Sequence, residues 1–211
     1  MRIVKYQILP EIDTLNRLRN VRLKGFGQPF VYQNANLHLI SGICIDLLTP
    51  PQRYVLRPTV EKIVEIATAF DTQYHIDVFS LVGALFFWTD EMDLSAEPIP
   101  FLPPIVEQSI ERNNRAVMLI NDGMHRVYAA RLLNRKPNVI FITNLPPEYP
   151  YYAYAIEEGW GGVEMIDELT DGYKKKDYRN PESYKALFRD FNSVFPGIQE
   201  QRKQTQAHLK E

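Results

Sequence analysis

The sequence predicts an α+β fold, because apolar runs of strand length alternate with segments whose apolar residues repeat at helical spacing. The most informative stretch runs from Val117 to Arg131, where a strand-like run meets an Asp122-Gly123 turn and a helix follows. A second helical repeat spans Val60 to Ala67. With 211 residues, of which 45% are hydrophobic, the chain can bury a core as one domain, with or without an appendage.

The first part of the chain predicts a strand, a short helix, two further strands and a longer helix. The first strand covers Ile3 to Leu9, and the short helix covers about Glu11 to Leu18. Residues 30–48 are rich in β-branched and aromatic side chains, so they predict two strands or a hairpin. Arg57-Pro58-Thr59 opens the longer helix, which we expect to end at Asp71.

The next segment leads into the central motif. Residues 78–89 form an uncharged apolar run of 12 residues, whereas a membrane-spanning helix needs roughly 20. We therefore expect a buried core element there. Residues 90–104 are acidic and rich in proline, and they mark the end of an N-terminal elaboration that covers residues 1–97. The central unit then covers residues 98–145.

The last part of the chain predicts an aromatic-rich extension over residues 146–198 and a polar tail over residues 199–211. Asn180-Pro181 is typical of a helix start, and apolar positions repeat at helical spacing from there to Val194. We therefore expect a final helix that runs from Pro181 to Val194.

Charge and cysteine content narrow the class of protein. The formal net charge is −2 and the pI is near 6.1, so the chain lacks the basic character of an isolated non-specific nucleic-acid binder. The single cysteine cannot form an intramolecular disulfide, and the four histidines are too scattered for a metal site. No apolar segment of signal-peptide length occurs near the N-terminus, and we expect a cytoplasmic protein.

The turn from Asp122 to Arg126 has the chemistry of an anion site. A helix that opens at Gly123 would point the backbone N–H groups of its first turn at whatever lies above the strand end. His125 and Arg126 place cations at this helix start, where they oppose the macrodipole unless an anion offsets them. The pattern therefore predicts phosphate binding by Gly123, Met124, His125 and Arg126.

The Asp-Gly-x-His-Arg pattern of residues 122–126 resembles the signature of the ParB/sulfiredoxin-like superfamily. The flanks agree, since residues 103–107 resemble the family's Pro-Ile-Val strand and residues 138–142 resemble the strand that follows the motif. The resemblance covers residues 98–145. It implies a mixed sheet with flanking helices, extended in this chain by N- and C-terminal elaborations.

Members of this superfamily differ in chemistry, so the resemblance is carried over position by position. Sulfiredoxins have a catalytic Cys where this chain has Met124, which argues against sulfinic acid repair. ParB-type nucleotide switches have Gly-Glu-Arg-Arg over residues 123–126, so an acidic residue and one arginine are missing here. Free-serine kinases have the more similar pattern, and their helix start holds nucleotide phosphates. The resemblance therefore implies ATP, ADP or CTP as a ligand, together with Mg²⁺.

Each candidate side chain also has a structural interpretation. Asp122 could cap the helix, and it could also bind a metal ion or accept a proton, since these roles do not exclude one another. Either His125 or Arg126 could pair with Asp122 or a nearby Glu instead of an anion, and Gly123 could serve only to provide a positive φ angle. Glu107 is either a general base in the same crevice or a surface residue.

Three other groups are candidates for ligand contact. Arg53 and Arg57 flank a proline-rich turn and could reach phosphates. The tyrosines at 149–154, together with Trp160, could stack on a base, although packing accounts for most of them. The basic run of residues 174–176 is either a solvated loop or a phosphate contact.

Two functions follow as hypotheses. The first is a phosphotransferase or nucleotide hydrolase in which Asp122, His125 and Glu107 are catalytic. The second is a non-catalytic module that senses a nucleotide or associates with nucleic acid, because a fold does not fix its chemistry. We expect the partner to be a nucleotide or a phosphorylated small molecule, disfavour nucleic acid, and expect no membrane association.

Overall fold

The computed structural model describes residues 1–197, which form an α+β fold. Its α-helices are α1 (Glu11–Leu18), α2 (Arg57–Tyr74) and α3 (Met124–Leu132). One sheet has the spatial order β1 (Ile3–Leu9), β6 (Ala84–Thr89) and β7 (Ile99–Phe101). The larger sheet has the spatial order β3 (Asn36–Ile40), β10 (Val139–Thr143), β8 (Ile105–Ile110), β9 (Ala116–Asp122) and β4 (Leu48–Thr49).

Short strand pairs and single 3₁₀ turns complete the described part. The pairs are β5 (Tyr54–Leu56) with β12 (Glu164–Ile166), β11 (Ala153–Tyr154) with β13 (Asp177–Tyr178), and β2 (Arg22–Leu23) with β14 (Arg189–Asp190). The 3₁₀ turns cover Ile45–Leu47, Val78–Ser80, Gly159–Gly162, Tyr184–Leu187 and Phe191–Ser193.

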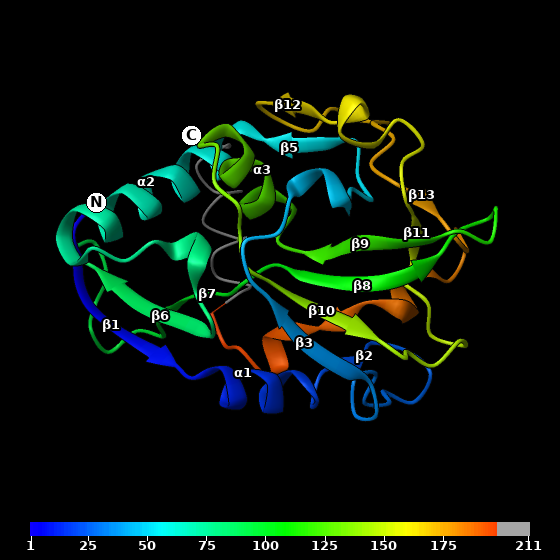
Figure 1. Ribbon diagram of the computed structural model, residues 1–211, viewed down its shortest axis with the longest axis horizontal. Coiled ribbons are helices and arrows are strands. Elements are labelled where there is room, and N and C mark those ends of the chain that lie inside the picture. The colour runs from blue at the N-terminus through cyan, green and yellow to red at the C-terminus, as the bar shows by residue number, and fades with distance from the viewer. Residues whose placement is uncertain (198–211) are drawn as a thin grey trace.

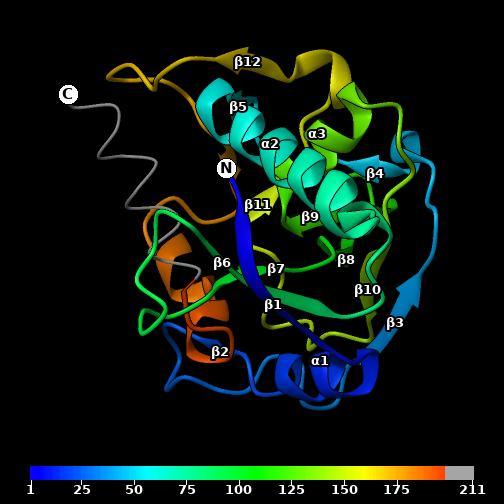
Figure 2. The same cartoon turned by 90° about the vertical axis from the view of Figure 1, so that its left-hand side faces the viewer.

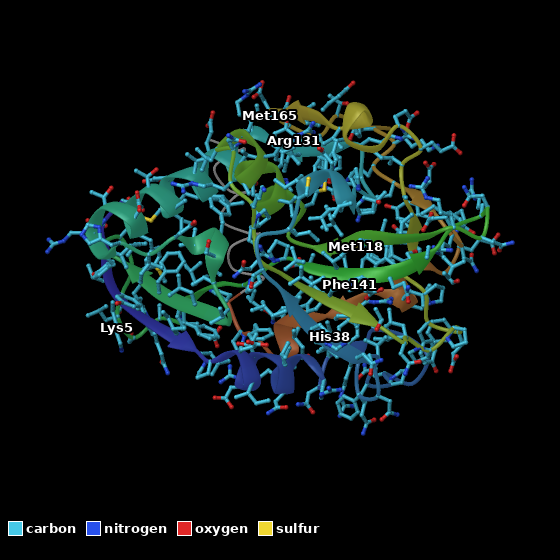
Figure 3. The ribbon with its side chains drawn as sticks, viewed as in Figure 1. Lys5, His38, Met118, Arg131, Phe141 and Met165 are labelled. Carbon is cyan, nitrogen blue, oxygen red and sulfur yellow. The ribbon has the colours of Figure 1, made fainter. Side chains whose placement is uncertain are left out.

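The helices lie on opposite sides of the two sheets. In Figure 1 and Figure 2, α2 and α3 run along the upper side, with the β5–β12 pair above them, and α1 lies along the lower side. The larger sheet is mixed, because β10 is parallel to β8 and β4 is parallel to β9, whereas β3–β10 and β8–β9 are antiparallel. Figure 3 places His38, Phe141 and Met118 on three of its strands, and His38 is the register partner of Phe141. The α+β fold class is thereby confirmed.

Apolar packing joins the segments that the sequence separates. One buried cluster combines Phe70 and Phe87 from the N-terminal part with Ile120 and Val127 from the central motif. A second cluster combines Leu18 with strand residues of the larger sheet and with Phe195 near the end of the described chain. The central motif is therefore held by side chains from both sides of it in sequence.

Residues 30–48 follow the first of their two expected forms, because β3 and the start of β4 are separate strands that pair with β10 and β9 and do not form a hairpin with each other. One expectation for the N-terminal part needs correction. The longer helix continues past Asp71 to Tyr74 and ends where His75 takes a left-handed conformation with φ 55°. By contrast, β1 and α1 have the expected bounds, and β6 is buried at every residue, as expected. No helix of the described residues is long and apolar enough to cross a membrane.

The expected final helix from Pro181 to Val194 is wrong. The segment instead forms two 3₁₀ turns separated by β14, which pairs antiparallel with β2. The apolar positions are still used, since Leu187 and Phe191 are buried. An extended backbone at Arg189 lets its side chain reach the interior, and this long-range contact outweighs the local helical periodicity. The polar tail expected over residues 199–211 lies outside the described residues.

Candidate functional site

A cavity of about 390 Å³ opens where β9 ends and α3 begins. Its floor includes Asn121 and the complete turn from Asp122 to Arg126, and its opposite wall comes from β5 and α2. Apolar side chains such as Leu56, Ile63 and Phe101 cover part of the wall. This volume and this mixture of apolar wall and convergent polar groups are usual for a small-molecule site.

Gly123 is required at this turn for two reasons. Its φ angle is 93°, in the left-handed region that non-glycine residues disfavour. A Cβ atom built on Gly123 would also lie 2.8 Å from Nη2 of Arg126 and 3.0 Å from the Cα atom of Pro104. Gly123 is the N-cap residue of α3, so Asp122 is not the N-cap residue. The expectation that Asp122 occupies the capping position is therefore corrected.

Arg126 folds back over the turn and pairs with Asp122. Its Nη2 donates to Oδ2 of Asp122 over 2.6 Å, and both side chains are largely buried, with exposed fractions of 13% and 18%. The contacts thus show Arg126 paired with Asp122, which is the structural interpretation of this residue. Within residues 1–197, the Nε atom of Arg126 is buried and has no hydrogen-bond partner. A buried donor without an acceptor costs about 1–3 kcal/mol, so this turn retains a donor for which an acceptor would be favourable.

His125 connects the starts of two helices. Its Nε2 accepts a hydrogen bond of 3.0 Å from the backbone N–H of Leu56, which is the residue before α2. This hydrogen bond ties the ring of His125 to the start of α2, so the side chain has a structural contact as well as a place at the cavity. A positive charge at residue 125 stays a prediction from the sequence.

Two helix starts converge on the cavity. The first turns of α2 and α3 both line it, through Thr59 and through the residues after Gly123. Neither Leu56 nor Gly123 makes an N-cap side-chain hydrogen bond. The first turn of α3 lines the cavity through Met124 to Arg126, so the positive end of its dipole favours an anionic ligand there. α2 lines the cavity along one side, from Thr59 to Ile66.

The charged side chains of the cavity wall are mainly cationic. Lys62, Arg126 and Lys176 line the cavity together with a single carboxylate, that of Asp122. Lys62 also pairs with Glu65 at the surface over 3.1 Å. A local excess of positive charge thus exists in a chain whose formal net charge is −2.

Glu107 lies in the interior rather than at the surface, which corrects one of the two interpretations of this residue. It is 1% exposed, and it does not line the cavity. Its carboxylate accepts from Nε and Nη2 of Arg189 over 2.9 Å each, from the hydroxyl of Tyr32 over 2.6 Å, and from the amide of Asn121. A catalytic role for Glu107 stays a prediction from the sequence.

Arg189 is the sequence-distant partner that makes this burial favourable. Its guanidinium makes five hydrogen bonds, two to Glu107 and three to backbone carbonyls, those of Tyr149, Pro150 and Leu187. Burial by itself lowers the pKa of Arg189, but the charges and hydrogen bonds of Glu107 and Tyr32 together outweigh it and the pKa is raised. Burial, reinforced by the negative charge of Glu107, holds the pKa of Tyr32 well above 10. Asn121 connects this cluster to the cavity floor.

The secondary candidates have different positions. Arg53 pairs with Glu158 and Asp177, Arg57 pairs with Asp167, and neither arginine lines the cavity. Tyr152 and Lys176 do line it. Lys174 and Lys175 border a more open hollow, which Lys176 also lines.

Sequence reasoning missed the residues that β5 and α2 contribute. Gln52, Thr59 and Lys62 belong to the cavity wall, and so does Asn121 of the recognised motif strand. The Arg57-Pro58-Thr59 helix start was the available signal, because a second helix start is a second potential anion site. That α2 and α3 line the same cavity depends on tertiary packing, which has no local signal in the sequence.

Metal binding would have to rely on one protein carboxylate. No group of three or more His, Cys, Asp or Glu side chains in residues 1–197 could hold a metal ion. Mg²⁺ commonly takes one or two carboxylates together with substrate phosphates and water, so Asp122 suits an ion that arrives with a nucleotide.

Comparison with protein families extends the motif resemblance. The family model described as ParB CE domain matches residues 13–164, which is more than two thirds of the chain. The chain therefore belongs to the ParB CE domain family, and the ParB-like assignment is confirmed. The match reaches well beyond residues 98–145 on the N-terminal side, so it includes α2 and its contribution to the cavity. No curated protein matches the chain.

Proposed function

We propose that this protein binds a nucleotide, or another phosphorylated small molecule, in the cavity at the Asp122–Arg126 turn. The observation that carries the proposal is the charge of the wall, where three cations accompany one carboxylate in a net acidic chain. The first turn of α3 adds the positive end of its dipole. The buried Nε of Arg126 adds a donor that has no hydrogen-bond partner among residues 1–197.

The apolar part of the wall supports a ligand that is larger than inorganic phosphate. Leu56, Ile63 and Phe101 provide contact surface beside the polar turn, and Tyr54 and Tyr152 provide aromatic faces. A nucleotide combines a charged group with a flat aromatic base, which matches this division of the wall.

Isothermal titration calorimetry with ATP, ADP, CTP and pyrophosphate tests the proposal. We expect binding by the wild type and a loss of about 1.5–3 kcal/mol in Arg126→Met, which removes a charge-assisted contact. Arg131→Met is the matched control, because Arg131 is in the last turn of the same helix (Figure 3). Its guanidinium lies over the Trp160 ring, and Arg131 does not line the cavity. This variant should bind as the wild type does. No binding by the wild type at millimolar ligand would contradict the proposal.

Catalysis is the second candidate, because Asp122 is a carboxylate beside the cations of the cavity. If the protein only binds, Asp122→Asn should bind Mg²⁺-free ligand at least as tightly, since it removes a negative charge from the wall. If Asp122 holds Mg²⁺ or takes a proton, the same variant should lose turnover by about 10² or more. Nucleotide turnover of both proteins, with serine as one acceptor, distinguishes the two. Turnover that depends on Asp122 would establish the enzyme.

A further inference from the structure

We propose that Lys176 contacts the phosphate group of the bound ligand, so that a segment beyond the family-matched residues completes the site. This inference rests on the proposed function and identifies one residue of that site. The family match ends at residue 164, whereas Lys176 lies twelve residues further along the chain and lines the cavity.

The position of the Lys176 ammonium group is fixed by two tyrosines. Nζ donates to the hydroxyl of Tyr151 over 2.8 Å and to the hydroxyl of Tyr152 over 2.7 Å. The same Nζ atom lies 5.2 Å and 4.7 Å from the two ring centroids. Tyr151 is 1% exposed, and its hydroxyl contacts the carbonyl of Asn121 over 3.4 Å. The lysine is thereby positioned against the residue that forms the cavity floor.

The backbone on either side of Lys176 is also held. The carbonyl of Lys175 accepts a hydrogen bond from the N–H of Arg53 over 3.2 Å. Asp177 pairs with the Arg53 side chain over 3.0 Å, and Asp177–Tyr178 forms β13 opposite β11. Arg53 therefore positions the segment that carries Lys176, which is a different role from the direct phosphate contact that its sequence position suggests.

The two phenol hydroxyls accept from the ammonium group and orient it toward the cavity wall. Burial, reinforced by Tyr152 and Glu107, holds the pKa of Tyr151 well above 10, so this hydroxyl keeps its proton at neutral pH. A lysine ammonium acts on phosphate as a compact point charge. A positioned ammonium at the wall of a cavity with an excess of cations is suited to phosphate, and the neighbouring Tyr152 ring is suited to the rest of the ligand.

The neighbouring lysines provide the contrast. Lys174 is 67% exposed and pairs with Asp177 over 2.5 Å. Lys175 is exposed, and neither Lys174 nor Lys175 lines the cavity. Of the basic run, only Lys176 belongs to the proposed site, so Lys175→Met removes the same charge from the adjacent position and is a matched control.

The test is calorimetric titration of pyrophosphate into the wild type, Lys176→Met and Lys175→Met. We expect Lys176→Met to bind about tenfold or more weakly, whereas Lys175→Met stays within about twofold of the wild type. Wild-type binding with equal affinity in Lys176→Met would overturn this inference and leave the proposed function intact. If the wild type binds neither pyrophosphate nor any nucleotide, both fail together.

A second measurement avoids the variant and its effect on folding. Lysine acylation of the wild-type protein, read by mass spectrometry with and without pyrophosphate, reports on each lysine separately. The expected result is slower acylation of Lys176 in the presence of pyrophosphate, with no change at Lys175. Acylation of Lys176 that is unchanged by saturating pyrophosphate would overturn the inference even if Lys176→Met fails to fold.

Discussion

Gly123 connects β9 to α3, and two demands meet at this residue. The backbone needs φ 93° to turn from the strand into the helix, and the space where a Cβ atom would stand is taken by Arg126 and Pro104. Either demand alone favours glycine. Together they explain why the sequence has glycine at this position of the turn.

Replacing Gly123 with alanine should therefore destabilise the protein. We expect Gly123→Ala to lower the free energy of unfolding by about 1–2 kcal/mol for the left-handed backbone alone, with the contact to Arg126 adding to it. Urea denaturation checks this value. Gly161→Ala is the control, because a Cβ there would meet nothing within 4 Å, and it should be neutral or slightly stabilising. Equal behaviour of the two variants would show that the turn is not strained.

Because Tyr32 is buried, we expect the free energy of unfolding to fall at alkaline pH. Burial raises its pKa well above 10 in the folded state, and repulsion from Glu107 adds to the effect. Below pH 10 the hydroxyl keeps its proton in both states, so its contribution is fully present. Above pH 10 the unfolded state releases the proton and the folded state does not, so the free energy of unfolding falls as pH rises.

The measurement is the free energy of unfolding between pH 9 and about 11.5 for the wild type and Tyr32→Phe. Each such tyrosine contributes a slope of up to about 1.4 kcal/mol per pH unit. The phenylalanine variant should be less stable at neutral pH, because Glu107 loses a donor, but its slope above pH 10 should be shallower by one proton. Identical slopes would mean that Tyr32 titrates alike in both states.

At the scale of elements, the buried Arg189–Glu107 pair holds the C-terminal segment against β8. Both side chains are 1% exposed. Arg189→Met leaves the charge of Glu107 buried without its partner, so we expect a loss of about 3–5 kcal/mol in the free energy of unfolding. The midpoint of urea denaturation measures this loss.

Arg57→Met is the matched comparison for an exposed ion pair. Arg57 pairs with Asp167 over 2.7 Å, but the two side chains are 43% and 77% exposed. Water and salt screen such pairs, so this variant should lose less than about 1 kcal/mol. A loss in Arg189→Met no larger than that in Arg57→Met would contradict the structural role given to the buried pair.

Elements whose signals are local could be predicted from the sequence. β1, α1 and the start of α2 match their expected bounds because periodicity and capping residues act within a few turns. The helix expected after Pro181 fails because Arg189 reaches Glu107, a contact between residues 82 positions apart. The pairing of β3 with β10 is missed for the same reason, since nothing near residues 36–40 specifies a partner 100 residues away.

The candidate site was predictable in its centre and not in its walls. Residues 122–126 do meet at one cavity, because strand, turn and helix follow one another in the chain. The orientation of the His125 ring and the burial of Glu107 depend on Leu56 and Arg189, which are distant in sequence. Partners that distant determine orientation and burial, and these cannot be inferred from residue type alone.

At the scale of the whole molecule, segments from three parts of the chain contribute most of the residues that line the cavity. Gln52 to Ile66 supplies one wall, the motif turn supplies the floor, and Tyr152 and Lys176 supply the remaining side. The two apolar clusters that join these parts hold the walls in place. We therefore expect an anionic ligand to bind in this cavity, beside the first turns of α2 and α3.

The most direct test is a ¹H–¹⁵N NMR titration of the isotope-labelled protein with pyrophosphate. We expect saturable shifts to concentrate on the amides of Gly123 to Arg126 and of Thr59, in the first turns of the two helices that line the cavity. The amides of Lys174 and Lys175, which border the more open hollow and not the cavity, should respond weakly. Saturable shifts confined to Lys174 and Lys175, or none in the two first turns, would contradict binding of an anionic ligand in this cavity.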